Sequence, residues 1–407
     1  MLWAEHVAAN TAGERDEVFA EVRREFSDAE LVELTGICGL FAVSNRFQDS
    51  MRLPIEEQGE VDKIRQSVRA DPKRLKAYIA RLVEHWPQAF PSSPTLLPEG
   101  EGSFVLPSPP GRGRAETWSR SPIHGDATVE ARNSTRDFGA LHPATGSHPS
   151  AGGQWNLLCP PRAQGEGGLT GESSRQIADA ASTAPAGCRV SLLDPAAATG
   201  DTARFFAAAG RLLGGVPNAV RVWGHVPHVG KLVLPFFIAV ERAGCGGVLP
   251  AALKVLVIAR ISHINSASYT LAHALAVGNA EGVTGDRMGE LSAVQCVNSP
   301  RFSASERAAL VWAQHVAQNT AKHHDAVFED LRRHFNDAEI VELTGLCAET
   351  NMVNRFCNAL RVPVESAAEL SALYGASRIE PARLMSYLES VLADWPRVLP
   401  VPDATAT

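Results

Sequence analysis

The chain has 407 residues, of which 45% are hydrophobic and 20% charged, and its formal net charge is −7 at pH 7. Its lysines and arginines form no block or stripe, which disfavours a nucleic-acid partner because phosphate backbones are bound through clustered cations. No uninterrupted apolar run approaches the roughly 18 residues that a membrane span needs. The seven cysteines are an odd number without a Cys-x-x-Cys pair, so we expect a reduced, cytoplasmic protein.

The first segment of the chain recurs near its end at a constant offset. Residues 3–12 return as residues 312–321, and the same offset pairs Asn45-Arg46-Phe47 with Asn354-Arg355-Phe356. Identities at a fixed offset indicate a duplication. The second copy has a long upstream partner segment and the first copy has none. We therefore interpret residues 1–92 as the C-terminal half of a duplicated domain, and we call this segment copy one.

The composition changes abruptly after copy one. Residues 93–187 are rich in proline, glycine and serine, and their few apolar residues follow no periodic order. Such a segment cannot bury enough apolar surface to offset the backbone entropy of ordering, which is about 1–2 kcal/mol per residue. We predict a disordered linker here, and translated intergenic sequence is one hypothesis for its origin. The Gly-Arg repeat at 111–114 is too short to indicate RNA binding.

The remaining part, residues 188–400, has the pattern of a complete helical domain. Apolar side chains recur at helical spacing over 202–213, and a long apolar run over 249–277 is interrupted by a polar centre at 262–266. Capping-box patterns begin at Ser303 and Asn336 and, in copy one, at Ser27. Alternating runs and Asn-Gly hairpins are absent from the sequence. The predicted fold class is all-α.

Several segments of this helical part carry a family pattern in a fixed order. They are 253–265, Tyr269, Leu271-Ala272-His273, 275–278, 303–310, 335–344 and Asn354-Arg355-Phe356. In these segments the chain resembles the carboxymuconolactone decarboxylase family, which includes the AhpD-type alkylhydroperoxidases. The resemblance covers about 190–370 in full, and about 1–60 as the C-terminal half only. It implies an α-helical domain that assembles as a homo-oligomer, commonly a trimer or a multiple of one.

The redox reagents of that family are missing from this chain. Its redox-active members use a glutamate, a Cys-x-x-Cys pair and a nearby histidine, and the pair supplies an attacking and a resolving thiol. The cysteine positions align with Ala267 and Thr270, and the glutamate position aligns with Val255. Moving the register by one residue substitutes Ser266 and Tyr269 for the cysteines and Lys254 for the glutamate. Neither register supplies a thiol, so we expect no disulfide mechanism.

The polar side chains that remain define a candidate site. On a continuous helix Tyr269 and His273 are four residues apart and share a face, and Asn265 lies one turn earlier on that face. In the functional interpretation His273 is a general acid or base, and Tyr269 and Asn265 donate hydrogen bonds or orient groups. In the alternative, these groups only hydrogen-bond one another inside an apolar bundle. We expect neither a metal ion nor another cofactor.

Two functions follow as expectations. By resemblance, the first is a peroxidase-like or decarboxylase-like enzyme that acts on a small organic substrate without metal or flavin. The second is a catalytically silent helical assembly module, in which copy one docks where the equivalent helices of a neighbouring subunit normally pack. The cavity discriminates between them, since convergence of His273 and Tyr269 on a cavity favours the enzyme and complete packing favours the module.

Overall fold

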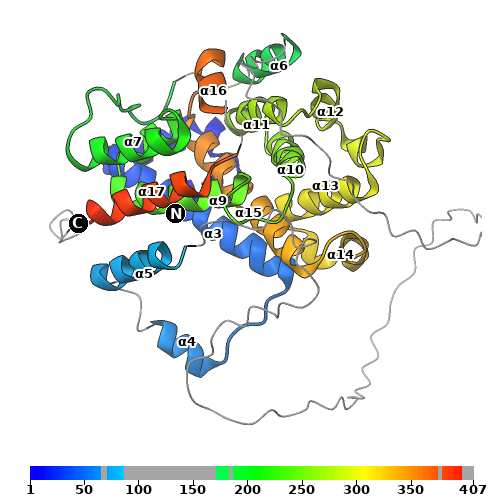
Figure 1. The fold of residues 1–407 in the computed structure, drawn as a ribbon, viewed down its shortest axis with the longest axis horizontal. Coiled ribbons are helices and arrows are strands. Elements are labelled where there is room, and N and C mark those ends of the chain that lie inside the picture. Colours follow the sequence, from blue (N-terminus) through cyan, green and yellow to red (C-terminus); the bar gives the residue numbers. More distant parts are fainter. Residues whose placement is uncertain (66–70, 87–170, 183–186, 375–377, 397–407) are drawn as a thin grey trace, which may run out of the picture. The chain divides into compact units, whose positions relative to one another are not determined.

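The structure, a computed structural model, describes residues 1–65, 71–86, 171–182, 187–374 and 378–396. Within these residues the chain forms helices and no strand, which confirms the all-α class (Figure 1). The elements are α1 (Leu2–Ala9), η1 (Ala12–Glu14), α2 (Asp16–Glu25), α3 (Asp28–Met51), α4 (Gln58–Arg65), α5 (Pro72–Glu84), α6 (Gly171–Ser182), α7 (Gly200–Leu213), α8 (Asn218–Trp223), α9 (Pro227–Glu241), α10 (Ala251–Ile264), α11 (Ser268–Ala280), α12 (Gly285–Glu290), η3 (Val294–Asn298), α13 (Ala304–Ala317), η4 (Ala321–His323), α14 (Asp325–Arg332), α15 (Asp337–Leu360), α16 (Ala367–Tyr374) and α17 (Pro381–Ala393). Among the described residues, no helix has both the length and the apolar character that a membrane span requires.

The helix starts that the capping-box patterns predict are confirmed. Ser27, Ser303 and Asn336 are the N-caps of α3, α13 and α15, and each side chain accepts a hydrogen bond from the backbone N–H three residues on. In each case the glutamate at that third position accepts the N–H of the cap residue in return. Two backbone donors that the first turn cannot satisfy are thereby paired.

One part of the predicted linker is helical instead. Residues 171–182 form α6, which packs on α11 and buries Ile177 and Ala180 in the same core cluster. This prediction was wrong for these residues because a short amphipathic stripe, supported by a neighbouring helix, is enough to order one helix. Residues 93–170 and 183–186 of the predicted linker lie outside the described residues.

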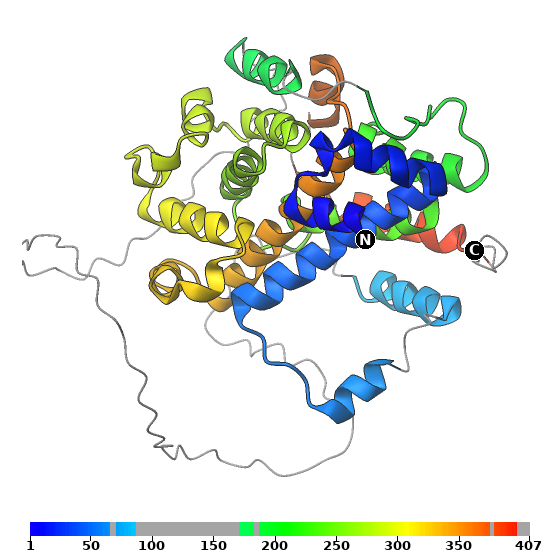
Figure 2. The ribbon, with the colours of Figure 1, turned by 180° about the vertical axis from the view of Figure 1, so that it is seen from behind.

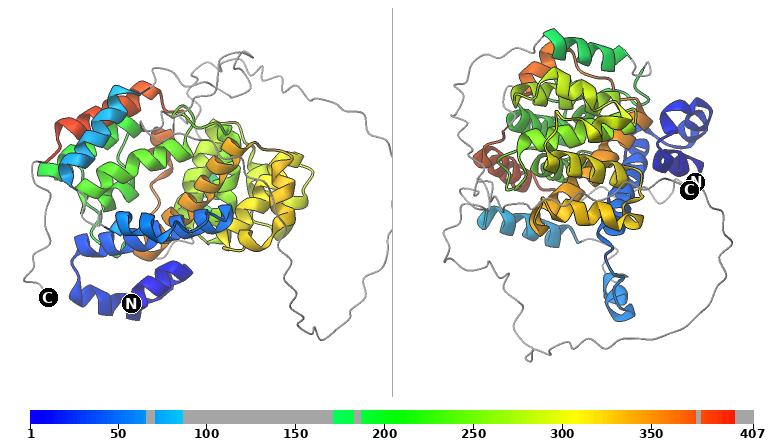
Figure 3. Two further views of the ribbon diagram at one scale, coloured as in Figure 1. Left: turned by 90° about the horizontal axis from the view of Figure 1, so that it is seen from below. Right: turned by 90° about the vertical axis from the view of Figure 1, so that its right-hand side faces the viewer.

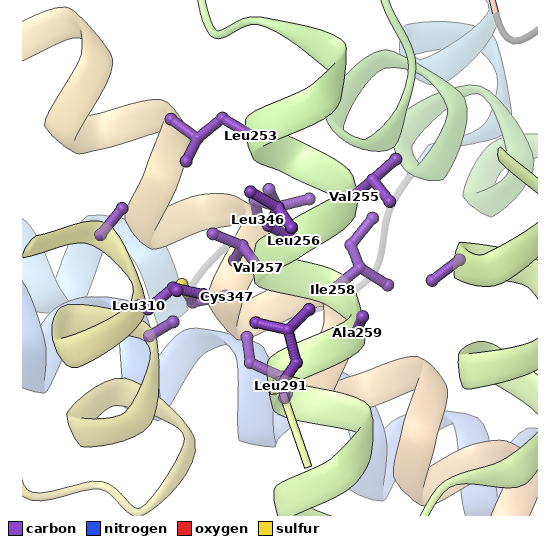
Figure 4. Close-up of a cluster of buried hydrophobic side chains, with 14 of the residues drawn as sticks. Leu253, Val255, Leu256, Val257, Ile258, Ala259, Leu291, Leu310, Leu346 and Cys347 are labelled. Atoms are coloured by element: carbon purple, nitrogen blue, oxygen red, sulfur yellow. The ribbon is translucent and has the colours of Figure 1, made fainter. Parts of the chain in front are cut away.

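Helix α10 is the centre of the core of the full domain. All ten residues from Leu253 to Ser262 are buried, so the helix is enclosed on every side by other helices. Figure 4 shows Leu253 and Val257 pointing to one side of α10, toward Leu346 and Cys347 of α15, and Val255 pointing to the other side. The predicted long apolar run is therefore an interior helix.

The two copies of the duplicated element pack against each other. Helices α3 and α15, which are equivalent in the duplication, make the most extensive helix–helix contact among the described residues (Figure 2). The equivalent helices α5 and α17 also lie side by side (Figure 3). Copy one thus docks on the full domain, with α3 and α5 each against its own duplicate.

The contacts between the copies are reciprocal, as in an interface with two-fold symmetry. The Arg355 guanidinium donates to the Ala8 carbonyl at 3.1 Å, and its counterpart Arg46 donates to the equivalent carbonyl of Ala317 at 3.4 Å. A second arginine pair, six residues further along the chain in each copy, repeats the pattern. Arg361 bonds to Gly13 O and Asp16, and Arg52 bonds to Lys322 O and Asp325, which are the equivalent partners. Residue i contacts j and j contacts i, which is the property of an isologous interface.

One face of α3 is left without the partners that its duplicate has. Ile37, Leu40 and Phe41 are 48%, 47% and 66% exposed, whereas their counterparts Leu346, Glu349 and Thr350 are at most 1% exposed. In the second copy α15 packs against α10, α13 and α9. The apolar face of α3 is thus exposed where the equivalent face of α15 is covered.

The equivalent glycines Gly36 and Gly345 give a matched test of the docking. A Cβ on Gly36 would meet the Trp223 ring at 2.6 Å, whereas a Cβ on Gly345 would meet no atom within 4 Å. Overpacking costs about 1–3 kcal/mol, whereas Gly to Ala in an open helix interior stabilises by about 0.5–1 kcal/mol. We expect Gly36→Ala to lower the melting temperature and Gly345→Ala to raise it in thermal unfolding. Equal shifts for the two variants would contradict the packing of α3 on Trp223.

Candidate functional site

A cavity lies inside the full domain between α7, α9, α10, α11 and α15. Its volume is about 110 Å³, and most of its wall consists of aliphatic and aromatic side chains. Its polar lining side chains are Glu241, Arg242, Tyr269, Thr270, His273 and the thiol Cys357. An apolar cavity with a few convergent polar groups is the usual form of a small-molecule site.

Tyr269 and His273 are together in this cavity. Both lie on α11, one turn apart, and their ring centroids are 4.3 Å from each other. The Tyr269 hydroxyl donates to Glu365 Oε1 at 2.9 Å and accepts the N–H of Ala219 at 3.2 Å. Nε2 of His273 is 2.7 Å from Glu365 Oε2. One carboxylate therefore holds both aromatic side chains in position.

Glu365 is a site residue that the sequence analysis missed. It lies between α15 and α16, about 90 positions after His273, and is only 7% exposed. A weak signal for it was present, since the duplication pairs the segment Pro363-Val364-Glu365 with Pro54-Ile55-Glu56. Sequence spacing alone could not indicate that this loop turns back onto α11.

The environment of Glu365 favours its charged form. Burial alone raises the pKa of this carboxyl, but the charge and hydrogen bond of His273 and the N–H of Asn218, 2.6 Å from Oε1, outweigh burial. The net result is a pKa below the ordinary value of 4.5. The carboxylate is thus available to stabilise a protonated imidazole at His273, as the carboxylate of a His–Asp pair does.

Asn265 does not belong to this group. The predicted single helix is broken, because α10 ends at Ile264 and Ser266 has a left-handed backbone with φ of 50°. Asn265 sits in the turn between α10 and α11, where its amide donates to Asn351 Oδ1 at 2.9 Å. Its carbonyl accepts from Asn10 of copy one at 2.7 Å. The expectation that it shares a face with Tyr269 assumed helical spacing through a segment that is a turn.

The positions aligned with the family's redox residues fall in two places. Thr270 and Val255 line the cavity, whereas Ala267 lines a separate surface hollow together with His263 and Ser266. The Thr270 hydroxyl donates to Asn354 Oδ1. In the alternative register Lys254 is fully buried, and its ammonium pairs with Glu342 at 2.5 Å. These side chains supply hydrogen bonds and packing but no thiol.

The cysteine that does line the cavity has the wrong protonation state for attack. Burial, followed by the negative charge of Glu365, raises the pKa of Cys357 well above its ordinary value. Cys347 on the same helix is completely buried, and burial raises its pKa as well. Because the thiolate is the nucleophile, both side chains are neutral thiols without catalytic reactivity.

Comparison with known proteins finds a curated relative that matches part of the chain. No protein-family model matches the chain. The chain is 28% identical over 161 residues to the uncharacterized protein YnjA of Escherichia coli (strain K12), a match that spans 39% of this chain and 86% of YnjA.

Two solved structures are also similar to this chain. One is an uncharacterized peroxidase-related protein from Silicibacter sp. TM1040, with a TM-score of 0.40 and 21% identity over 47% of this chain and 98% of that one. The other is an alkylhydroperoxidase AhpD core, an uncharacterized peroxidase-related protein from Ralstonia eutropha JMP134. It has a TM-score of 0.38 and 20% identity, and covers 46% of this chain and 97% of its own.

Proposed function

We propose that residues 188–400 are an AhpD-like domain of the carboxymuconolactone decarboxylase superfamily, with copy one as an attached half-domain. Its cavity binds a small organic acid and performs acid–base chemistry without a thiol. The observation that carries this proposal is that His273, a lining residue of a mostly apolar cavity, is held by the buried carboxylate of Glu365 behind it. A histidine so placed can move a proton to or from a bound molecule, which is the commonest role of this side chain in catalysis.

The groups present suit a decarboxylation better than a peroxide reduction. When an organic acid loses CO2, the C–C bond breaks and its electron pair passes into a neighbouring carbonyl system. A proton must then be delivered to carbon. Protonated His273 can supply that proton, and Glu365 stabilises the imidazolium before transfer. Peroxide reduction by this family's route needs a thiolate, and the cavity contains only the neutral thiol of Cys357.

The test is turnover of small lactone acids, followed as CO2 release. We expect activity in the full chain, and a fall of about 10²–10⁴-fold in kcat/KM for His273→Ala, which is the usual contribution of a general acid–base group. His323→Ala removes an exposed histidine and serves as the matched control. Unchanged turnover in His273→Ala would contradict the proposal, as would activity that requires peroxide and disappears in Cys357→Ser.

A second candidate function is that of an assembly module. The reciprocal contacts of α3 with α15 favour it, because copy one occupies α15 in the way a two-fold-related subunit would. The exposed Ile37, Leu40 and Phe41 provide a further apolar face for a homo-oligomer. The same chain can be both an enzyme and an assembly module. The assembly function is tested by measuring the oligomeric state of a chain from which copy one has been deleted.

A further inference from the structure

The turn between α10 and α11 sets the direction of the helix that carries Tyr269 and His273. It contains Ser266, whose left-handed backbone has φ of 50°. The N–H of Ala267 closes the turn by donating to the Ser262 carbonyl at 2.8 Å. A residue other than glycine is strained in this backbone conformation and persists only where its surroundings hold it. The groups that hold this turn therefore also hold α11.

Copy one provides one of these groups. The Asn10 side-chain amide donates to the Asn265 carbonyl at 2.7 Å. The amide of Asn358 on α15 donates to the same carbonyl at 3.1 Å, and it also donates to Asn10 Oδ1 at 3.1 Å. Two donors thus occupy the acceptor sites of one carbonyl oxygen, and the three residues form a closed ring of hydrogen bonds. Copy one, the turn and α15 meet at this ring.

The side chain of Asn265 ties the turn to copy one by a second route. Its amide donates to Asn351 Oδ1 at 2.9 Å, and the Arg355 guanidinium donates to the same oxygen at 2.9 Å. Arg355 also donates to the Ala8 carbonyl of copy one at 3.1 Å. Asn265, Asn351 and Arg355 are all at most 6% exposed. Buried polar groups must keep their partners, because leaving one unpaired costs more than a typical hydrogen bond contributes.

The turn acts on the cavity through the first residues of α11. Tyr269 and Thr270 follow the turn directly, and both line the cavity. The Thr270 hydroxyl donates to Asn354 Oδ1 of α15, and the Tyr269 hydroxyl donates to Glu365 Oε1 at 2.9 Å. His273 lies one turn later on the same helix. A shift of α11 moves all three cavity side chains together, and catalysis is sensitive to displacements of about 1 Å.

The duplication shows that the local backbone does not require the Asn10 contact. Asn319, the equivalent residue of the second copy, has the same left-handed backbone, with φ of 58° against 59° for Asn10. In both copies the N–H of the next residue donates to the carbonyl five positions earlier at 2.9 Å. In the part of the chain that the structure describes, Asn319 makes no hydrogen bond to the α10–α11 turn. The two residues share a local conformation, and Asn10 alone uses its amide to hold that turn.

We propose that Asn10 of copy one is a positioning residue of the candidate site. It holds the α10–α11 turn, and the turn holds α11 in the direction that presents Tyr269 and His273 to the cavity. Docking of copy one therefore regulates the cavity, since the docked state keeps α11 in place and the undocked state releases the turn. The effect on turnover rests on the proposed function, whereas the hold on the turn does not.

Hydrogen exchange of the full chain, followed by mass spectrometry, tests the hold on the turn. Asn10→Gly removes the amide and keeps a residue suited to the left-handed backbone, and Asn319→Gly makes the same change at the equivalent position. We expect peptides that cover 262–271 to exchange about tenfold faster in Asn10→Gly, because a buried carbonyl loses a donor. Asn319→Gly should leave these peptides at the parent rate. Equal rates in Asn10→Gly and the parent, or the same acceleration in both variants, overturns the proposal.

A second variant separates the amide from the docking of copy one as a whole. Asn10→Asp keeps the shape and the acceptor oxygen of asparagine, but at pH 7 it cannot donate to the Asn265 carbonyl. We expect faster exchange over 262–271 while α3 keeps its protection. If either variant releases copy one, which faster exchange throughout α3 reveals, the turn must still exchange faster because its donor has left. The parent rate over 262–271 in Asn10→Asp overturns the proposal.

Turnover of the lactone acids separates this role from the acid–base function. We expect Asn10→Gly to lower kcat by about ten- to a hundredfold with little change in KM, because α11 is displaced while the apolar wall that binds the substrate is kept. Asn319→Gly should change neither constant. Faster exchange with an unchanged kcat refutes the role in turnover. Faster exchange in a chain whose parent turns over no lactone acid leaves only the hold on the turn, and parent exchange rates in an active Asn10→Gly leave only the acid–base function.

Discussion

Deleting residues 1–86 is expected to convert the chain into a two-fold dimer. The deletion removes α1, α2 and α3 from α15 and leaves Arg355 and Arg361 without the carbonyls of Ala8 and Gly13. The full domain carries the equivalent carbonyls itself, at Ala317 and Lys322, and these already accept from the counterpart arginines of copy one. Two truncated chains can therefore satisfy each other's arginines through the same geometry, and dimerisation also buries the uncovered apolar side chains of α15.

The oligomeric mass, measured by analytical ultracentrifugation over a range of concentrations, checks this expectation. The truncated chain should be a dimer at micromolar concentration. Arg355→Glu in the truncated chain should be a monomer, because a carboxylate cannot donate to the Ala317 carbonyl. The same substitution in the full chain reports on docking of copy one. A truncated chain that keeps its helix content and stays monomeric at all concentrations would refute the interpretation of copy one as a built-in partner.

Sequence alone predicted the parts of this architecture that depend on local chemistry. The caps at Ser27, Ser303 and Asn336 and the interior helix at 251–264 follow from side-chain pattern, and the structure confirms them. The docking of copy one could not be predicted in the same way. Its hydrogen bonds run from arginine side chains to backbone carbonyls, which every residue possesses and which therefore leave no signature in the sequence.

The residues of the candidate site were likewise predicted where they depend on local spacing and missed where they depend on tertiary packing. Tyr269 and His273 were found because both lie on one helix and their spacing places them on one face. Asn265 was misplaced because a single left-handed residue, Ser266, ends the periodicity on which that inference depended. Glu365 reaches His273 from the loop after α15, and only tertiary packing brings the two together.

Glu365→Ala is expected to lower the free energy of unfolding by about 3–5 kcal/mol at pH 7, because each buried group left without its hydrogen-bond partner costs about 1–3 kcal/mol. The variant leaves the His273 ring, the Tyr269 hydroxyl and the Asn218 N–H without their shared acceptor. Its matched control is Glu56→Ala, which removes the equivalent but exposed glutamate of copy one. An exposed side chain without such partners should change stability by no more than about 0.5 kcal/mol.

The dependence on pH identifies the carboxylate charge as the cause. The folded-state pKa of Glu365 lies below its ordinary value of 4.5, so its stabilisation is fully present above pH 4.5 and is lost as pH falls through the folded-state pKa. The difference in stability between the parent and Glu365→Gln should therefore be largest near neutral pH and shrink in acid, as measured by urea unfolding. A constant difference would assign the effect to packing, and equal losses in Glu365→Ala and Glu56→Ala would refute the buried hydrogen-bond network of Glu365. A pair that behaves as expected also joins α11 to the loop after α15, because α11 supplies the imidazole and that loop supplies the carboxylate. The stability of the fold and the geometry of the proposed acid–base site then depend on the same interaction.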